Sequence, residues 1–312
     1  MIAGTDEAGR GPLAGPVVAG AVILDPNNPI DGLTDSKKLT EKKRLFLEQQ
    51  IKEKASAWSV GIVHEQDIDR INILQASLKA MHIAIHSLKK KPDFVQVDGN
   101  KLIPELGIDQ KAIVGGDLSE QAISAASIIA KTARDGMMQN YHVLFPLYGF
   151  DKHKGYGTKQ HFDAIKEHGA SPIHRNSFNP VSDFPNKKFC LKKNHGNIGV
   201  MGELFAGMYF VRNGYEILEK NLHVSNNGEI DLLVKKDALY VVVEVKSGFN
   251  VSLDDAVSRV DEYKQKQLGY ISGQYFTNNE IVPFDVRFDI VVVQFSSSKP
   301  TLTHLEEAFL PI

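Results

Sequence analysis

Residues 1–24 constrain the fold of this chain more than any other segment. An apolar run ends in two adjacent acids, Asp6 and Glu7, a glycine-rich turn at 9–12 follows, and a second apolar run occupies 17–24. This order predicts two strands joined by a tight loop, with the acids where the first strand ends. Because successive strand side chains face opposite sides, both carboxylates reach one site only at a strand end or a twist. The alternative interpretation is a solvated Asp-Glu pair at a turn.

The residues of the turn favour an anionic ligand. Gly9 and Gly11 allow backbone N–H groups to approach a ligand closely, and Arg10 between them carries a planar guanidinium that matches a phosphate group. We therefore expect a functional site beside the two acids.

Two further acids follow apolar runs. Asp98 comes directly after 94–97, and Asp117 follows 113–116 and opens a helix. In open α/β sheets, ligand sites gather at the ends of strands, so these acids are expected to join the first pair. Asp117 also forms a capping-box pattern with Glu120, and a capping role for it stays open.

Four carboxylates predict a metal site of a particular kind. The chain has a single cysteine, Cys190, which excludes a Cys-rich zinc site and an internal disulfide framework. Carboxylate oxygens suit Mg²⁺ or Mn²⁺ rather than zinc. Sites of this type commonly hold two ions, which activate water and stabilise the leaving oxygen of a phosphodiester.

Charge and hydropathy limit which binding partners and which cellular location the sequence predicts. The chain carries 36 Lys and Arg against 38 Asp and Glu, and neither half has the basic excess of a protein that only grips nucleic-acid backbone. If the partner is a nucleic acid, the contact is therefore expected to be confined to a limited part of the protein. No apolar run is long enough for a membrane span and no signal-peptide pattern is present, so the sequence predicts a soluble, cytoplasmic protein with no membrane partner.

The chain is long enough for two domains. Its 312 residues alternate strand-like and helix-like segments on both sides of 184–197, where Pro, Lys, Asn and Gly gather without apolar periodicity. The sequence predicts an α/β domain at 1–183, a linker at 184–197 and a second α/β domain at 198–312, both with mixed sheets.

The expected elements follow from the periodicity. In the first domain, strands are expected near 1–6, 17–24, 58–64, 93–97 and 110–114, and helices near 41–54, 72–89, 119–139 and 158–168. In the second domain, helices are expected near 200–213 and 253–271, and strands near 229–234, 239–245 and 286–294.

Several residues are expected to be structural. The Ala-, Ser- and Ile-rich run at 122–133 favours a helix that packs closely on a sheet, and Lys131 is spaced to pair with Asp135 along it. Four histidines lack the spacing of zinc ligands and are interpreted as surface residues: His153, His161, His168 and His174.

Five motifs occur in order across the first domain: DEAGRGPLAGPVV at 6–18, DSKKLT at 35–40, VDGN at 97–100, GGDLSEQAISAASIIAKTARD at 115–135 and HKGYGT at 153–158. Together they resemble type 2 ribonuclease H, bacterial class HII. The resemblance implies an RNase H-like mixed sheet with flanking helices. It also implies a metal-dependent endonuclease that cleaves the RNA strand of RNA–DNA hybrids and single ribonucleotides in duplex DNA. Cleavage would fall on the 5′ side of the ribonucleotide and leave a 3′-hydroxyl.

The resemblance also assigns residues. The catalytic acids that would hold two metal ions are Asp6, Glu7, Asp98 and Asp117. The loop that would read the ribose 2′-hydroxyl is Gly9, Arg10 and Gly11, and Tyr156 would pack on the adjacent deoxyribose. Phosphate contacts would come from Ser36, Lys37 and Lys38. For Lys38, a solvated turn at the start of a helix stays open.

The second domain contains an acid pair beside a lysine. Asp231 and Glu244 are expected on neighbouring strands of a hairpin, and Lys246, two residues after Glu244, shares its face. Two acids that bind Mg²⁺ next to a lysine that positions water form a workable hydrolytic site.

Ordered blocks extend this pattern: GE at 202–203, GYEILEKN at 214–221, GEIDLL at 228–233, VEVKSG at 243–248 and RFDIVVV at 287–293. They resemble the restriction-endonuclease-like pattern and, more closely, the YraN family of predicted endonucleases. The resemblance implies a restriction-endonuclease-like fold, DNA as a possible partner, and a site of Glu203, Asp231, Glu244 and Lys246. Asp289 is a weaker candidate, and Leu222 stands where a basic residue is expected. Two alternatives stay open, a solvated polar face on the hairpin and a non-catalytic docking or recruitment module.

Overall fold

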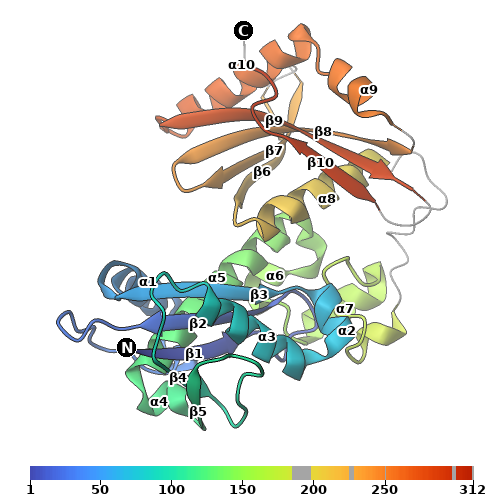
Figure 1. Cartoon of the computed structure of the whole chain (residues 1–312). Helices are drawn as coiled ribbons and strands as arrows, with labels where there is room; N and C mark the ends of the chain where they lie inside the picture. The colour runs from blue at the N-terminus through green and yellow to red at the C-terminus, as the bar shows by residue number, and fades with distance from the viewer. Residues whose placement is uncertain (185–197, 225–227, 250, 297–299, 311–312) are drawn as a thin grey trace. The chain divides into compact units, whose positions relative to one another are not determined.

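The computed structural model describes residues 1–184, 198–224, 228–249, 251–296 and 300–310. The chain divides into two compact units, Met1–Gln139 with Tyr148–Lys187, and Asn140–Leu147 with Lys188–Ile312 (Figure 1). Apart from Phe184, the predicted linker at 184–197 lies outside the described residues, and so does Cys190.

The first unit is built on a five-stranded mixed sheet (Figure 1). Its strands, in spatial order, are β3 (Ala57–Val63), β2 (Val17–Ile23), β1 (Ile2–Ala8), β4 (Phe94–Asp98) and β5 (Asp109–Ile113). The first three pair antiparallel, whereas β4 lies parallel to β1 and β5 parallel to β4. The predicted strands and their mixed arrangement are confirmed.

Helices cover both faces of this sheet. The α-helices are α1 (Glu41–Lys54), α2 (Glu65–Ile71), α3 (Ile73–His86), α4 (Gly116–Ser119), α5 (Gln121–Leu144), α6 (Phe150–His153) and α7 (Lys159–His168). The 3₁₀ turns are η1 (Ser36–Lys38), η2 (Pro146–Tyr148) and η3 (Val181–Asp183). The sequence prediction missed α2, because Asn72 interrupts the apolar period there. Asn72 has φ of 64° and caps α3 by accepting from Leu74 N and Gln75 N.

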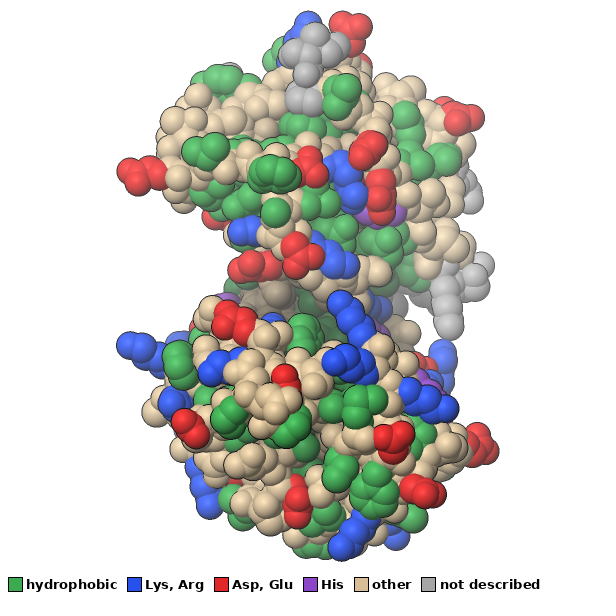
Figure 2. All heavy atoms as spheres, turned by 60° about the vertical axis from the view of Figure 1, so that its left-hand side comes forward, with side chains coloured by type: hydrophobic (Ala, Val, Ile, Leu, Met, Phe, Trp, Pro, Cys, Tyr) green, Lys and Arg blue, Asp and Glu red, His purple; other side chains and the backbone are tan. Residues whose placement is uncertain are grey.

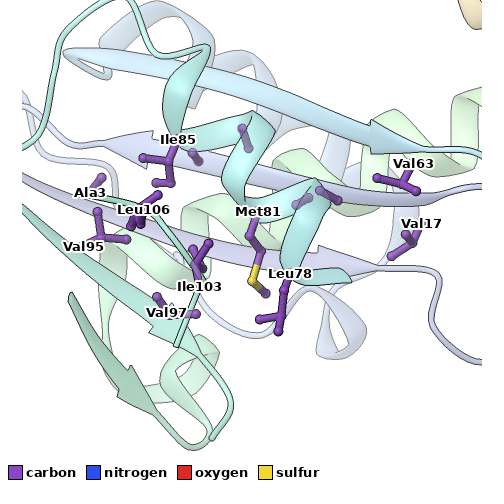
Figure 3. Packing of buried hydrophobic residues seen from close by; sticks show 14 of the residues in the cluster. Ala3, Val17, Val63, Leu78, Met81, Ile85, Val95, Val97, Ile103 and Leu106 are labelled. Atoms are coloured by element: carbon purple, nitrogen blue, oxygen red, sulfur yellow. The ribbon is translucent and has the colours of Figure 1, made fainter. Parts of the chain in front are cut away.

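Two apolar layers hold the sheet between the helices. On one face, Met81 and other residues of α3 pack on Ala3, Val95 and Val97 of β1 and β4 (Figure 3). On the other face, α1 and α5 pack on Val22 of β2. Burial of these side chains is the main favourable term in folding of this unit.

Glycines in the strands let the helices approach the sheet closely. A Cβ at Gly20 would lie 2.3 Å from the carbonyl oxygen of Ala126 in α5, and one at Gly61 would lie 2.0 Å from that of Ala80 in α3. Both distances are far below van der Waals contact, so a larger residue would push the helix away. The run at 122–133 is thus core, as predicted, and Lys131 Nζ donates to Asp135 Oδ1 at 2.7 Å.

The second unit contains a separate five-stranded mixed sheet. Its spatial order is β10 (Thr301–Leu305), β9 (Asp285–Phe295), β8 (Leu239–Phe249), β7 (Glu229–Lys236) and β6 (Glu216–His223). The β8–β9 pair is parallel and the other pairs are antiparallel. Its helices are α8 (Ile198–Arg212), α9 (Leu253–Ser258) and α10 (Glu262–Asn278).

Three features of this unit differ from the sequence prediction. The edge strands β6 and β10 were missed, because both are only partly buried and lack a sustained apolar run. The helix expected at 253–271 is two helices. Asp261 ends the continuity, because its side chain accepts from Lys264 N and caps α10.

The surface agrees with the balanced composition. Figure 2 shows acidic and basic side chains interspersed on the visible face of each unit. Among the described helices, none combines the length and the apolar character needed to cross a bilayer.

Candidate active site

The four acids of the first unit meet at one edge of its sheet. Asp6 and Glu7 lie near the end of β1, and Asp98 is the last residue of β4. Because β1 and β4 are parallel and Thr5 pairs with Val97, Asp6 and Asp98 lie on adjacent strand ends. Asp117 comes from the first turn of α4, which begins after Gly115 in the left-handed region, with φ of 69°. The capping-box interpretation of Asp117 is wrong, because the cap residue is Gly115 and α5 starts only at Gln121.

Electrostatic repulsion shows how closely these carboxylates approach. Burial raises the pKa of Asp6 well above its usual value, and the charges of Glu7 and Asp98 raise it further. Burial likewise raises the pKa of Glu7, against the opposing effect of Arg10, whose Nη1 lies 3.2 Å from Glu7 Oε1. Burial and then Asp98 raise the pKa of Asp117. The charge of Asp98 therefore raises the pKa of each of the other three carboxyl groups.

The donor set fits a hard divalent cation. Asp98 Oδ1 is buried and accepts no hydrogen bond, so it is an oxygen with an unused lone pair inside an acidic cluster. Mutual repulsion and raised pKa values are what a cation would relieve. Within the described ranges, no three His, Cys, Asp or Glu side chains surround one point closely enough to form a ready-made metal site.

A lysine and two serines complete the acidic cluster. Burial lowers the pKa of Lys37, but nearby carboxylates, first Asp35 and then Asp6 and Asp117, together raise it above its usual value. Ser36 is buried and its hydroxyl lies 2.8 Å from that of Ser127 in α5. Ser127 also hydrogen-bonds Asp6. The sequence interpretation missed Ser127, because a serine in a small-residue helix carries no signal of its own.

The glycine turn lies against Tyr156. A Cβ at Gly11 would lie 3.6 Å from Tyr156 Cε1, and the tyrosine is 44% exposed, so one side of the ring is open to solvent. Gly9 has φ of 98°, and a Cβ there would collide with the side chain of Arg134. Gly9 is therefore required by close approach and by backbone conformation, whereas Gly11 leaves ordinary contact space beside the tyrosine ring.

Three of the four histidines interpreted as surface residues are buried instead: His153, His161 and His174. Ser171 N donates to His174 Nδ1 at 2.9 Å, which leaves the proton of His174 on Nε2. That nitrogen lies 3.0 Å from His161 Nε2, and His161 Nδ1 lies 3.0 Å from the carbonyl oxygen of Tyr156. The pairing assigns His174 as donor to His161 and His161 as donor to Tyr156. Two neutral imidazoles thus hold the backbone of Tyr156.

The two buried, neutral histidines predict that the stability of the fold depends on pH. Burial lowers the pKa of His174 to about 3 and that of His161 to about 4. Since the unfolded chain binds protons near the usual pKa of about 6.5, these histidines stabilise the fold above that pH and lose the contribution as pH falls toward 4. The contribution of these histidines to the free energy of unfolding should therefore be lower at about pH 5.5 than at about pH 7.5. In His174→Asn, which keeps an acceptor for Ser171, we expect the loss of unfolding free energy between these two pH values to be smaller than in wild type by about 1 kcal/mol.

Urea unfolding at the two pH values measures this effect. Comparison of variant with wild type cancels the opposite contribution of acids such as Asp6, whose raised pKa makes the fold gain stability as pH falls. The same substitution at His86, which is exposed on α3, serves as the control. If His174→Asn shows the same pH dependence of the unfolding free energy as wild type, the assignment of His174 as a buried, neutral imidazole is contradicted.

The second unit brings its predicted residues together as well. Leu232 pairs with Val243, so Asp231 on β7 lies opposite Glu244 on β8. Both are buried, and Lys246 Nζ lies 2.6 Å from Glu244 Oε1, as their shared face predicted. Burial and then the charge of Glu244 raise the pKa of Asp231 to about 7, with a smaller contribution from Glu203 of α8.

Two lysines in this cluster were missed from the sequence. Lys264 of α10 places Nζ 3.1 Å from Glu244 Oε2, and Lys220 of β6 places Nζ 3.6 Å from Glu203 Oε2. Neither lysine stands at a recognisable spacing from the acids in the sequence, so spacing alone did not single these out. Lys220 supplies a positive charge two residues before Leu222, where a basic residue was expected.

Asp289 does not belong with these side chains. It pairs with Val243 while Ile290 pairs with Glu244, so Asp289 and Glu244 face opposite sides of the sheet. Its buried carboxylate is already bound by Arg287 Nη2 at 2.8 Å, His304 Nε2 at 2.7 Å and Glu307 N at 3.1 Å. Asp289 is therefore an internal anchor.

A mixed sheet with helices on both faces and acids gathered at the ends of β1 and β4 fits a nuclease of the ribonuclease H type. The family described as Ribonuclease HII matches residues 3–181, and the family described as Uncharacterised protein family UPF0102 matches residues 202–293. The chain belongs to the ribonuclease HII family and is an endonuclease of that class. Both family resemblances expected from the motifs are confirmed.

Curated relatives agree with this assignment. Ribonuclease HII of Idiomarina loihiensis is 61% identical over 181 residues, which are 58% of this chain and 96% of the relative. That of Vibrio parahaemolyticus is 59% identical over 181 residues, 58% of this chain and 85% of the relative. Among solved structures, ribonuclease H2 from Pyrococcus horikoshii is similar with a TM-score of 0.50 and 28% identity, over 58% of this chain and 95% of that one.

Proposed function

We propose that the first unit is a metal-dependent endoribonuclease that cleaves the RNA strand of RNA–DNA hybrids and single ribonucleotides embedded in duplex DNA. Cleavage on the 5′ side of the ribonucleotide would leave a 3′-hydroxyl. The observation that carries the proposal is the convergence of Asp6, Glu7 and Asp117 on Asp98, next to a glycine turn that contacts Tyr156. We also propose the cytoplasm as its location.

Each side chain has a role in this reaction. The four acids would hold Mg²⁺ or Mn²⁺, two ions being usual for such a site, and the bound metal would supply an activated water and stabilise the leaving oxygen. Lys37 carries a positive charge that interacts with Asp6, Asp98 and Asp117, and it is suited to a substrate phosphate. The N–H groups of the glycine turn would read the 2′-hydroxyl. The half-exposed ring of Tyr156 would pack on the deoxyribose that follows, where an extra hydroxyl would clash.

Product analysis tests this function. Duplex DNA with one ribonucleotide is incubated with the full chain and Mg²⁺ or Mn²⁺, beside an all-DNA duplex and a reaction with excess EDTA. We expect one cut on the 5′ side of the ribonucleotide, a product that a polymerase can extend from its 3′-hydroxyl, and loss of cutting in EDTA. Cleavage in EDTA, or a product that cannot be extended, would contradict the proposal.

For the second unit we infer a second metal-dependent nuclease that acts on DNA. The supporting observation is the pair of buried acids, Asp231 and Glu244, which face each other beside Lys246. These two oxygen donors, with Glu203 nearby, suit Mg²⁺. Lys264, which bridges from α10, adds a cation suited to a DNA phosphate. The competing proposal is a docking module that recruits another protein.

A DNA panel separates the two proposals. In the Asp98→Asn background, where ribonuclease cleavage is expected to be lost, the protein is incubated with Mg²⁺ or Mn²⁺ and single-stranded, nicked, flapped and branched DNA. A second nuclease predicts cleavage that Glu244→Ala abolishes and that Glu216→Ala, at an exposed acid of β6, leaves intact. Absence of cleavage on every substrate would contradict the nuclease proposal and favour docking.

A further inference from the structure

Two arginines of the first unit are buried almost completely, Arg134 of α5 at 1% exposure and Arg175 after α7 at 0%. Among the described residues, neither guanidinium forms an ion pair with a carboxylate; both are bonded to backbone carbonyls instead. The charges of Glu65 and Asp69 act on Arg175, and that of Asp135 acts on Arg134, without direct ion pairs. Burial of a charge that is bonded mainly to carbonyl groups is costly, so these residues need an explanation. The carbonyls that they bind belong mainly to the glycine turn and the segment after it.

Arg175 binds four carbonyl oxygens of this one loop. Its Nη2 donates to Gly9 O at 2.6 Å and to Pro16 O at 3.2 Å, its Nη1 to Arg10 O at 2.9 Å and its Nε to Gly15 O at 2.9 Å. The guanidinium also lies 5.0 Å from the ring centroid of Phe178. Four of its five N–H donors are thus bonded within this loop.

Arg134 joins the same loop to the segment that carries Tyr156. Its Nε donates to Pro16 O at 3.0 Å, its Nη2 to Ala14 O at 3.1 Å and its Nη1 to Lys154 O at 3.0 Å. Lys154 stands two residues before Tyr156 in the chain. One side chain therefore fixes the spacing between the turn and the tyrosine.

The direction of the carbonyls determines the direction of the amides. The peptide bonds after Gly9 and Arg10 are trans, so each N–H points opposite to its C=O. Because Arg175 draws the carbonyls of Gly9 and Arg10 inward, the N–H groups of Arg10 and Gly11 point away from it, to the opposite side of the turn. Those are the N–H groups that the proposed function assigns to the 2′-hydroxyl.

We propose that Arg175, assisted by Arg134, is a positioning residue that turns the Arg10 and Gly11 amides toward substrate at a fixed spacing from Tyr156, and thereby sets the preference for an RNA–DNA junction. This inference rests on the proposed function of the first unit. Burial lowers the pKa of Arg175 to about 9 and that of Arg134 to about 10, so both remain charged at neutral pH.

Arg175→Lys tests the proposal. Lysine keeps the charge but has one nitrogen, which cannot reach four carbonyls. Cleavage is measured on a duplex with one ribonucleotide and on an all-RNA strand paired with DNA. We expect the ratio of the two rates to fall about tenfold to a hundredfold. The junction needs the amides on the 2′-hydroxyl and Tyr156 on the next deoxyribose at the same time, whereas an all-RNA strand has a 2′-hydroxyl at every position and no deoxyribose for the ring. Arg70→Lys, at an exposed arginine of α2, is the matched control.

Two further measurements separate positioning from general destabilisation. Tyr148→Phe removes a buried hydroxyl that donates to Gly169 O at 2.8 Å and does not touch the turn, so it should leave the ratio unchanged. In Arg175→Ala, millimolar guanidinium should restore part of the junction preference, whereas ammonium should not. If Arg175→Lys shows no cooperative unfolding transition, Arg134→Lys replaces it and should lower the same ratio.

The outcomes distinguish this inference from the proposed function. A wild-type protein that cuts neither substrate, or shows no junction preference, would overturn the proposed function and the inference with it. A wild-type protein that prefers the junction, with a folded Arg175→Lys variant that keeps the ratio, would overturn the positioning role alone.

Discussion

Replacement of Asp98 by asparagine should lower the rate of cleavage at an embedded ribonucleotide by about a thousandfold or more, with the first unit still folded. Asp98 is the carboxylate sensed by Asp6, Glu7 and Asp117, and its buried Oδ1 accepts no hydrogen bond. Loss of one charged oxygen donor from such a cluster removes about 4 kcal/mol of transition-state stabilisation, since each 1.36 kcal/mol is tenfold in rate. Single-turnover cleavage with saturating Mg²⁺ measures the effect.

The stability of the same variant provides a second readout. Because Asp98 repels its neighbours, its neutralisation should leave the urea midpoint unchanged or raise it. Asp109→Asn is the matched control, because Asp109 is exposed at the start of β5 and lies outside the cluster. Asp98→Asn activity within about tenfold of wild type would contradict the assignment of Asp98 as the central acid.

Replacement of Asp289 by alanine should lower the free energy of unfolding of the second unit by about 3–5 kcal/mol. The reason is that Asp289 is fully buried and binds both Arg287 and His304, which the substitution would leave without this buried acceptor, beside their exposed partner Glu306 and, for His304, the Tyr209 hydroxyl. Thermal unfolding followed by circular dichroism measures the shift. Ribonuclease cleavage below the unfolding temperature should stay at the wild-type level.

Asp285→Ala, at an exposed acid at the start of the same strand, is the control for Asp289→Ala. The experiment also discriminates between the two roles considered for Asp289. A residue that binds metal among like charges gives a stable, inactive variant when replaced, whereas an internal anchor gives an unstable one. A stable Asp289→Ala protein would contradict the anchoring role.

The sequence predicted most elements of both sheets, and the elements that it missed depend on tertiary pairing or on a single cap. Strands such as β2 and β8 are long apolar runs that remain buried in any arrangement, so local pattern identifies them. By contrast, β6 and β10 are edge strands whose polar faces resemble loops, and only pairing with a neighbouring strand makes them regular. The break between α9 and α10 depends on a single cap at Asp261.

The candidate sites divide in the same way. Acids such as Asp6 and Asp98 stand at strand ends, and the ordered motifs around them are short-range signals that one sequence carries. The pair of Asp231 and Glu244 is likewise local to one hairpin. The sequence could not show that Asp289 faces away from that pair, because its direction depends on which strand lies beside β9.

The sequence by itself determined the strand ends, the acids that stand at them and the two families, because each of these depends on residues a few positions apart. Tertiary structure alone decided which charges are buried and with which partners. Arg175 bonds Arg10 from 165 positions away, and Ser36 meets Ser127 across 91. No periodicity records such contacts, because they form only when the sheet and its helices close around them. The backbone of the glycine turn is therefore set by arginines that the turn's own sequence does not contain.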